Sequence, residues 1–150
     1  MIRSEEWTPQ ITYRLHQNGL HELIYNESSH EAVDAFFSYI SRFAEDGHPD
    51  DVYCILNDLR FSNHQPLNYY FSSLRAINQK YDVQNRPKAR IALVYGNNSP
   101  FVGTVDALIR VINPARVKIR LFSSVDYPIA VEWLHQELKN SKLNPASSSV

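Results

Sequence analysis

The stretch from Asp51 to Arg60 constrains the fold most, because residues 52–56 are five apolar residues in a row without alternation. An uninterrupted apolar run of this length is typical of a strand that is covered on both faces. Polar residues follow it at Asn57, Asp58 and Arg60. In an open α/β sheet, ligands bind beyond the carboxyl ends of such strands. We therefore predict a central buried strand whose far end borders a candidate site.

The totals fit one globular domain of 150 residues with 43% hydrophobic residues. A net charge of -1 gives no overall positive field, so we expect no nucleic-acid partner. Cys54 is the single cysteine, which excludes an internal disulfide and suits a reducing compartment. The first ten residues include two glutamates and no apolar core, and no apolar run approaches about 20 residues. We therefore expect a cytoplasmic protein without a secretion signal or a membrane span.

A hairpin is predicted at the start of the domain. Residues 11–16 alternate apolar and polar side chains, Asn18 and Gly19 favour a tight type I′ turn, and residues 20–26 return. A two-residue loop would place His16 opposite His21. We expect residues 1–10 to be a loose N-terminus.

Helices and strands then alternate along the chain. Ser28 and Glu31 form a capping box that opens a helix ending at Gly47, and Pro66 opens a second helix that reaches Tyr81. Residues 91–95 read as a buried strand. A third helix is predicted from Ser99 to residue 112.

The last strand and helix follow. Residues 117–121 alternate with charged Lys118 and Arg120, which is typical of an edge strand. A helix after Asp126 has a buried stripe, and residues 140–150 are expected to be a disordered tail. The fold prediction is a single α/β domain over residues 11–139 with a mixed five-stranded sheet and four helices, in the order β-β-α-β-α-β-α-β-α. The predicted stripe consists of Ala130, Trp133, Leu134 and Leu138.

This order, with its Asn-Gly hairpin first, resembles the STAS domains of anti-sigma-factor antagonists, and more closely the bacterial STAS/SEC14-like proteins. The likeness includes the strand that ends in residues 57–60, and the last strand running through residues 122–126 into Ala130, Trp133 and Leu134. It spans residues 11 to 138. Its motifs are mainly positions that determine the fold.

The resemblance implies a candidate phosphorylation site. In antagonist STAS domains, a serine in an Asp-Ser-x-Gly pattern at the start of the second helix is phosphorylated. Ser62 is the only serine in the corresponding region here, and it lacks the adjacent aspartate and the following glycine. Ser62 therefore corresponds to the phosphorylated serine of the family by its position alone.

Polar residues at the strand ends suggest a partner or ligand edge. Several predicted helices begin there, and free N–H groups at helix N-termini favour anions such as phosphate or carboxylate. The alternative is that these serines only cap helices. The candidate residues are Asp58, Arg60, Ser62, Asn63, His64, Tyr69, Asn97, Asn98, Ser99 and Ser123.

Catalytic and cofactor motifs are not recognisable in the sequence. Residues 96–103 match neither a P-loop nor a GxGxxG fingerprint, and the six histidines lack HExxH spacing. Asp58, Ser62 and His64 are triad residue types without a nucleophile elbow. We therefore expect no cofactor, no metal and no assigned catalytic residue.

Two functions follow as hypotheses. The first is a non-enzymatic regulatory or scaffold domain that binds another protein through residues 62–70. The second is binding of a small amphiphile or anionic metabolite at the strand C-terminal edge, which predicts a closed apolar pocket with a polar mouth. A homodimer through the hairpin edge or the second helix is a further option.

Overall fold

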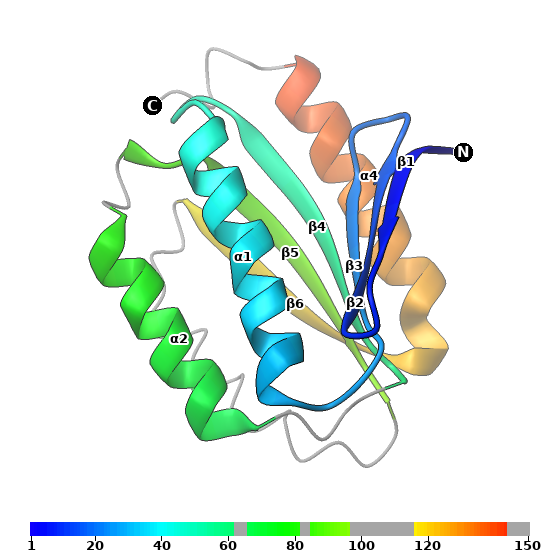
Figure 1. The fold of residues 1–150 in the computed structure, drawn as a ribbon. Helices are drawn as coiled ribbons and strands as arrows, with labels where there is room; N and C mark the ends of the chain where they lie inside the picture. The colour runs from blue at the N-terminus through cyan, green and yellow to red at the C-terminus, as the bar shows by residue number, and fades with distance from the viewer. Residues whose placement is uncertain (62–65, 82–84, 97–115, 144–150) are drawn as a thin grey trace.

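A computed structural model describes residues 1–61, 66–81, 85–96 and 116–143 (Figure 1). These residues form an α/β domain with one mixed six-stranded sheet, whose strands lie in sequence order. The strands are β1 (Ile2–Trp7), β2 (Ile11–His16), β3 (His21–Tyr25), β4 (Val52–Leu59), β5 (Lys88–Tyr95) and β6 (Val117–Ser123). The helices are α1 (His30–Asp46), α2 (Leu67–Lys80) and α4 (Tyr127–Leu143), and the 3-10 turn η2 (Ser124–Asp126) precedes α4. The helix predicted from Ser99 lies outside the described residues.

The sixth strand is β1, which the sequence reading took for a loose N-terminus. It pairs antiparallel with β2, from Ile2 opposite His16 to Trp7 opposite Thr12. Each of its six residues is exposed. A strand without a buried face has no apolar alternation to reveal it, so the prediction of five strands was wrong.

The β2–β3 hairpin has a three-residue loop instead of the expected two-residue loop. The N–H of His16 donates to the carbonyl of Leu20, and the N–H of Gly19 donates to the carbonyl of His16. Gly19 has a φ of 98°, the left-handed conformation of a type I turn with a bulge. The register therefore places Leu15, not His16, opposite His21.

The remaining strands run parallel from β3 through β6. Strand β4 lies in the sheet interior, as predicted, but it continues to Leu59. Asn57 and Asp58, expected as the polar end beyond the strand, are inside it and are 1% and 0% exposed. Strand β6 is an edge of the sheet that the described residues form, as predicted from its charges.

Helices cover both faces of the sheet (Figure 1), and a hydrophobic cluster lies on each face. On one face, α1 and α2 pack their aromatic stripes, including Phe36 and Tyr70, against β2 to β5. On the other face, α4 packs Ala130, Leu134 and Leu138 against β4 and β5. These three members of the predicted stripe are buried, and Trp133 packs at its margin.

Helix boundaries differ from the predicted ones by a few residues. The hydroxyl of Ser29, not Ser28, caps α1 by accepting from the N–H of Ala32 at 3.0 Å. Pro66 is the N-cap of α2, so the helix begins one residue after the predicted position. Helix α4 continues to Leu143, into the segment predicted to be a disordered tail. Residues 144–150 lie outside the described part of the chain.

Candidate functional site

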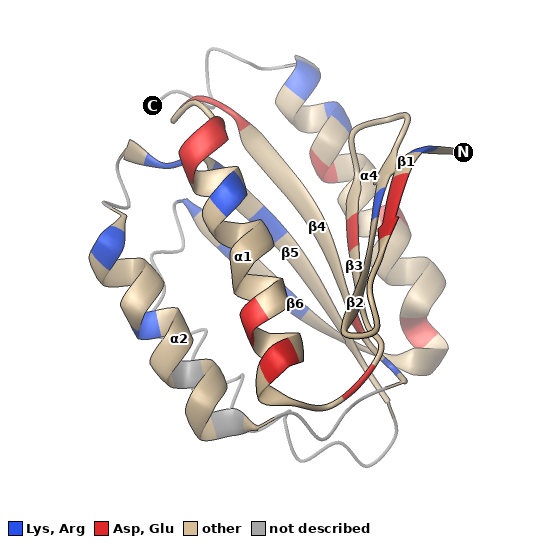
Figure 2. Cartoon of the chain, viewed as in Figure 1, with Lys and Arg blue, Asp and Glu red and all other residues tan. Residues whose placement is uncertain are grey.

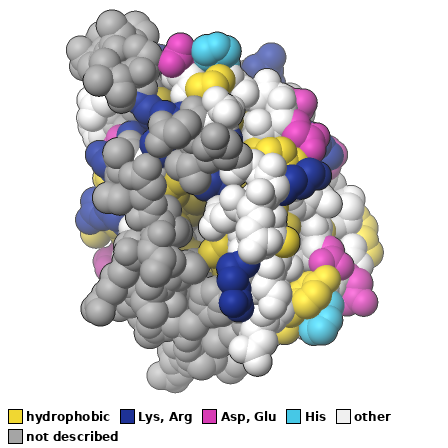
Figure 3. All heavy atoms as spheres, turned by 90° about the vertical axis from the view of Figure 1, so that its left-hand side faces the viewer, with side chains coloured by type: hydrophobic (Ala, Val, Ile, Leu, Met, Phe, Trp, Pro, Cys, Tyr) yellow, Lys and Arg dark blue, Asp and Glu magenta, His cyan; other side chains and the backbone are white. Residues whose placement is uncertain are grey.

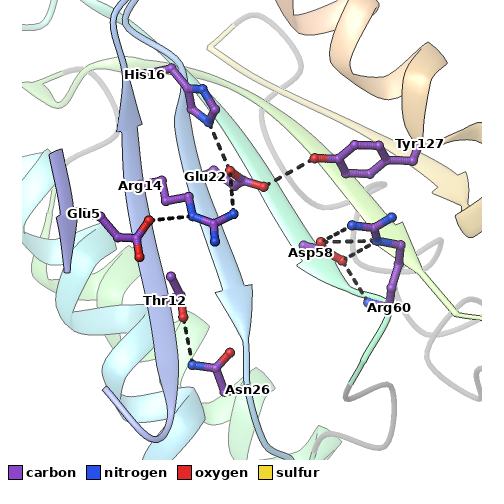
Figure 4. Close-up of polar contacts among 9 residues, drawn as sticks. All are labelled: Glu5, Thr12, Arg14, His16, Glu22, Asn26, Asp58, Arg60 and Tyr127. Carbon is purple, nitrogen blue, oxygen red and sulfur yellow. Dashed lines mark hydrogen bonds and ion pairs between the residues drawn. The ribbon is translucent and has the colours of Figure 1, made fainter. Parts of the chain in front are cut away.

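Asp58 and Arg60 form the best-defined pair at the strand-end edge, meaning the carboxyl ends of β3 to β6 (Figure 4). The Asp58 carboxylate is 0% exposed and accepts from Arg60 Nη2 at 2.8 Å and from Nε at 3.0 and 3.2 Å. Its Oδ1 also accepts from the Arg60 backbone N–H at 3.0 Å. This pairing raises the pKa of the Arg60 guanidinium. These paired hydrogen bonds hold the Arg60 side chain at the end of β4.

Arg60 also contacts two aromatic rings. Its guanidinium carbon lies 4.0 Å from the ring centroid of Tyr127 and 5.1 Å from that of Phe61. The Tyr127 hydroxyl donates to Glu22 Oε2 at 3.3 Å. Burial, and then the charges of Glu22 and Asp58, raise the pKa of Tyr127 to about 12. The start of α4 is thus joined to both β3 and β4 by polar contacts.

Glu22 is a buried carboxylate that the sequence reading did not single out. It is 4% exposed, and its Oε1 lies 3.0 Å from His16 Nε2 and 3.8 Å from Arg14 Nη1 (Figure 4). Arg14 Nε in turn donates to Glu5 Oε2 at 2.9 Å. The correct hairpin register, with Arg14 opposite Glu22, is the feature that would have indicated this pairing.

The other described candidates lie at the same end of the sheet but do not join this network. Ser123 ends β6, two strands from β4, and its hydroxyl lies 3.3 Å from Asp126 Oδ2. Tyr69 lies on α2, where its ring stacks on His30 with centroids 4.1 Å apart and its hydroxyl donates to Asp34. The candidates Ser62, Asn63, His64, Asn97, Asn98 and Ser99 lie outside the described residues.

Exposed apolar side chains lie beside Arg60 and near Tyr127 in the sequence. Phe61 is 73% exposed, and Val125 and Ile129, which flank Tyr127 in sequence, are 79% and 57% exposed. Large apolar side chains gathered on a surface mark interaction sites more often than scattered ones do. This edge therefore combines a fixed cation with apolar side chains that are open to solvent.

A second feature is a cavity of about 340 Å³ between α1, α2 and the sheet. Its volume lies within the range of about 300–1,000 Å³ that is usual for small-molecule sites. Figure 3 shows the α2 side of the molecule, where Lys and Arg side chains lie next to hydrophobic ones. The cavity lining is mainly aromatic and aliphatic, and includes Phe37, Ile40, Tyr53, Leu74, Ile91 and Ile119.

Lys and Arg residues lie where β5 and β6 begin (Figure 2), and two of them line this cavity. Arg86 and Lys88 contribute to the lining, and Lys88 is 4% exposed. Burial, and then the charge of Arg116, lower the pKa of both Arg86 and Lys88. Arg90 adds to the effect on Lys88. Arg90 and Arg116 are not part of the cavity lining, and Arg90 pairs with Glu137 of α4 on the opposite face of the sheet.

Backbone carbonyls hold two of these arginines. Arg116 Nη2 donates to the carbonyls of Pro49 at 3.0 Å and Arg86 at 2.6 Å. Arg90 Nη1 donates to the carbonyls of Ala89 at 3.0 Å and Arg116 at 3.2 Å. Arg90 and Arg116 are partly buried, whereas Lys118 and Arg120 on β6 are exposed.

Two kinds of site are absent from the described ranges. Those ranges contain no group of three or more His, Cys, Asp or Glu side chains placed to hold a metal ion. No helix among the described elements is long and apolar enough to cross a membrane. Cys54 is 0% exposed, and burial raises the pKa of its thiol to about 12. A thiol in this state is a packing residue, not a nucleophile.

Comparison with known proteins gives no family for the chain: no family model, no curated protein and no solved structure matches it.

Proposed function

We propose that this protein binds a small amphiphilic molecule in the cavity between α1, α2 and the sheet. The observation that carries the proposal is an apolar lining around about 340 Å³ with cationic residues at one end. An apolar body with few polar groups is the usual composition of a small-molecule site. The ligand's apolar part would lie along the aromatic residues of α1, and its polar part near the start of β5.

The position differs from the one that the sequence hypothesis gave for an amphiphile. That hypothesis placed the ligand at the strand C-terminal edge, whereas the cavity reaches the first residues of β5 and β6, including Ala89 and Val117. The strand-end edge is polar because Asp58 binds Arg60 there, and Glu22 binds Tyr127 and Arg14 nearby. The helix-covered face offers the apolar volume instead.

A cavity-filling substitution tests the proposal. Ala44 lines the cavity, so Ala44→Phe is expected to place a ring inside it and abolish ligand binding. Ala76→Phe, at an exposed position on α2, is the matched control. Purified protein is analysed by native and denaturing mass spectrometry for a released small molecule, and by displacement of a fluorescent apolar probe. Equal probe binding by both variants and the parent chain would count against this site.

A second candidate function is a regulatory or scaffold domain that binds another protein at the strand-end edge. The exposed side chain of Phe61 beside Arg60 favours it, as do those of Val125 and Ile129, which flank Tyr127 in sequence. This is the role that the STAS resemblance implies, and membership of that family is likewise part of the proposal. A second copy of the chain would be one such partner.

Substitution on this edge separates the two functions. Ile129→Asp is expected to prevent capture of a cross-linked partner while leaving probe binding in the cavity unchanged. Asn140→Asp, also exposed on α4, is the matched control. Light scattering reports whether the partner is a second copy. If both variants retain the same cross-linked species, that species does not use this edge.

A further inference from the structure

We infer that the cleft between α4 and the β2–β3 hairpin is a second ligand site, which takes a small uncharged molecule through a hydroxyl group, as in an alcohol or a phenol. We call it the α4 cleft. It lies on the opposite face of the sheet from the first cavity and shares no lining residue with it, so the inference is independent of the proposed function. Its lining includes His16, Leu20, Leu56, Tyr127, Val131 and His135.

The first step is the size and composition of the cleft. Its volume is about 440 Å³, within the range of about 300–1,000 Å³ that is usual for small-molecule sites. Leu20 and Leu56, which are 2% and 1% exposed, give it an apolar part together with Val131. The described lining includes no Asp, Glu, Lys or Arg side chain. A molecule with an apolar body and no charge therefore fits this cleft better than an ion, which would lose its hydration there.

The second step is a buried carboxylate that contacts two of the polar lining residues. Glu22 is 4% exposed, and its Oε1 lies 3.0 Å from His16 Nε2 (Figure 4). Its Oε2 accepts from the Tyr127 hydroxyl at 3.3 Å. One buried group thus holds the polar ends of two rings, from β2 and from α4. Side chains that are positioned in this way are typical of a preorganised binding site.

The third step is the hydrogen bonding that these two rings have left. An ionised carboxylate only accepts hydrogen bonds, so His16 Nε2 and the Tyr127 hydroxyl are the donors to Glu22. In the neutral imidazole, Nδ1 is then an acceptor, and the Tyr127 oxygen also keeps a lone pair. Within the described part of the chain, neither acceptor has a hydrogen-bond donor. A hydroxyl group is the smallest neutral group that would donate to one of them.

The test compares two probes, 2-naphthol and 2-methoxynaphthalene, which share a ring system but differ in the O–H donor. Binding to the full chain is followed at neutral pH by NMR titration of the backbone amides. The naphthol is expected to bind roughly fivefold more tightly, which is the size of one hydrogen bond between neutral groups. Signals of Leu20 and Val131 report on the α4 cleft, and those of Phe37 and Leu74 report separately on the first cavity.

Two variants, each with a matched control, locate the probe. Val131→Phe is expected to prevent binding of both probes in the α4 cleft, whereas Asn140→Phe, at an exposed position on the same helix, is expected to leave binding unchanged. His16→Phe is expected to remove the roughly fivefold preference for the naphthol while its affinity for the methyl ether stays the same. His48→Phe makes the same change at an exposed position outside the lining and is expected to keep the preference.

Each outcome decides one part of the inference. If neither probe shifts the signals of the α4 cleft in the parent chain, the site is refuted, and shifts confined to the first cavity would leave the proposed function standing. If the methyl ether binds the cleft as tightly as the naphthol, the hydroxyl class of ligand is overturned. If His16→Phe keeps the preference, the hydroxyl group does not bind at His16. The comparison of the two probes in the parent chain needs no variant, so the inference is tested even where a variant does not fold.

Discussion

Removing Asp58 and removing Arg60 are expected to change the stability of the fold by different amounts. Asp58 is fully buried, whereas the Arg60 side chain is 26% exposed. In Asp58→Ala, the guanidinium can turn toward water. In Arg60→Met, the carboxylate stays buried, and among the described residues the backbone N–H of residue 60 is its remaining hydrogen-bond donor. Removing the arginine is therefore expected to destabilise the fold more than removing the aspartate.

The magnitudes follow from what each change leaves behind. Loss of hydrogen bonds to a charged group costs about 1.5–3 kcal/mol, which we assign to Asp58→Ala. Leaving a buried charge unpaired costs about 3–5 kcal/mol, which we assign to Arg60→Met. The double variant is expected to lose less stability than the sum of the two, with a coupling free energy of about 1–3 kcal/mol.

Urea denaturation measures these values for the three variants and the parent chain. With a slope of about 2 kcal/mol per molar urea, a loss of about 4 kcal/mol lowers the midpoint by about 2 M. The slopes must agree for the comparison to hold. Equal losses in the two single variants, or additive losses in the double variant, would refute the reasoning that an unpaired buried carboxylate dominates.

Three further predictions concern residues outside this pair. Gly47→Ala is expected to lower the free energy of unfolding by about 1–3 kcal/mol, because a Cβ there would lie 2.3 Å from Pro87 Cγ; urea denaturation measures the loss, and an unchanged midpoint would contradict it. Cys54, with a thiol pKa of about 12, is expected to react with a thiol reagent only as fast as the protein opens, so rapid reaction of the native protein would contradict its burial. Burial lowers the pKa of His21 to about 4, below about 6.5 in an unfolded chain, so the unfolded state takes up the proton first as the pH falls. The stability contributed by neutral His21 is thus fully present above about pH 6.5 and is lost toward about pH 4, by up to roughly 3 kcal/mol. Parallel pH profiles of the parent chain and His21→Gln would exclude this contribution.

Local patterns predicted the elements that bury a face. The apolar run in β4, the aromatic stripe of α1 and the spacing of Ala130, Leu134 and Leu138 each indicated the correct type of element. These patterns arise because one side of each element is removed from water. β1 has no such side, so pairing with β2, not its own sequence, identifies it as a strand.

The candidate site depended on contacts between distant residues. Asp58 and Arg60 lie two residues apart, so the sequence brought them together as candidates. Glu22 was missed because its partners are His16 in the neighbouring strand and Tyr127, 105 residues away. The cavity was anticipated as a type of site but not in position, because its lining comes from helices and strands that meet only in the fold.

The strand order has a consequence for how the chain assembles during synthesis. Because each strand lies beside its predecessor, every new strand can add to an existing edge as the chain emerges, without insertion between strands already paired. Helix α4, however, is made after all six strands. Until it docks, the ribosome-bound chain leaves one face of the sheet in water, and that face is where a chaperone would bind a nascent copy. The buried residues that would be uncovered include Leu20, Cys54, Leu56, Ala92, Val94 and Phe122.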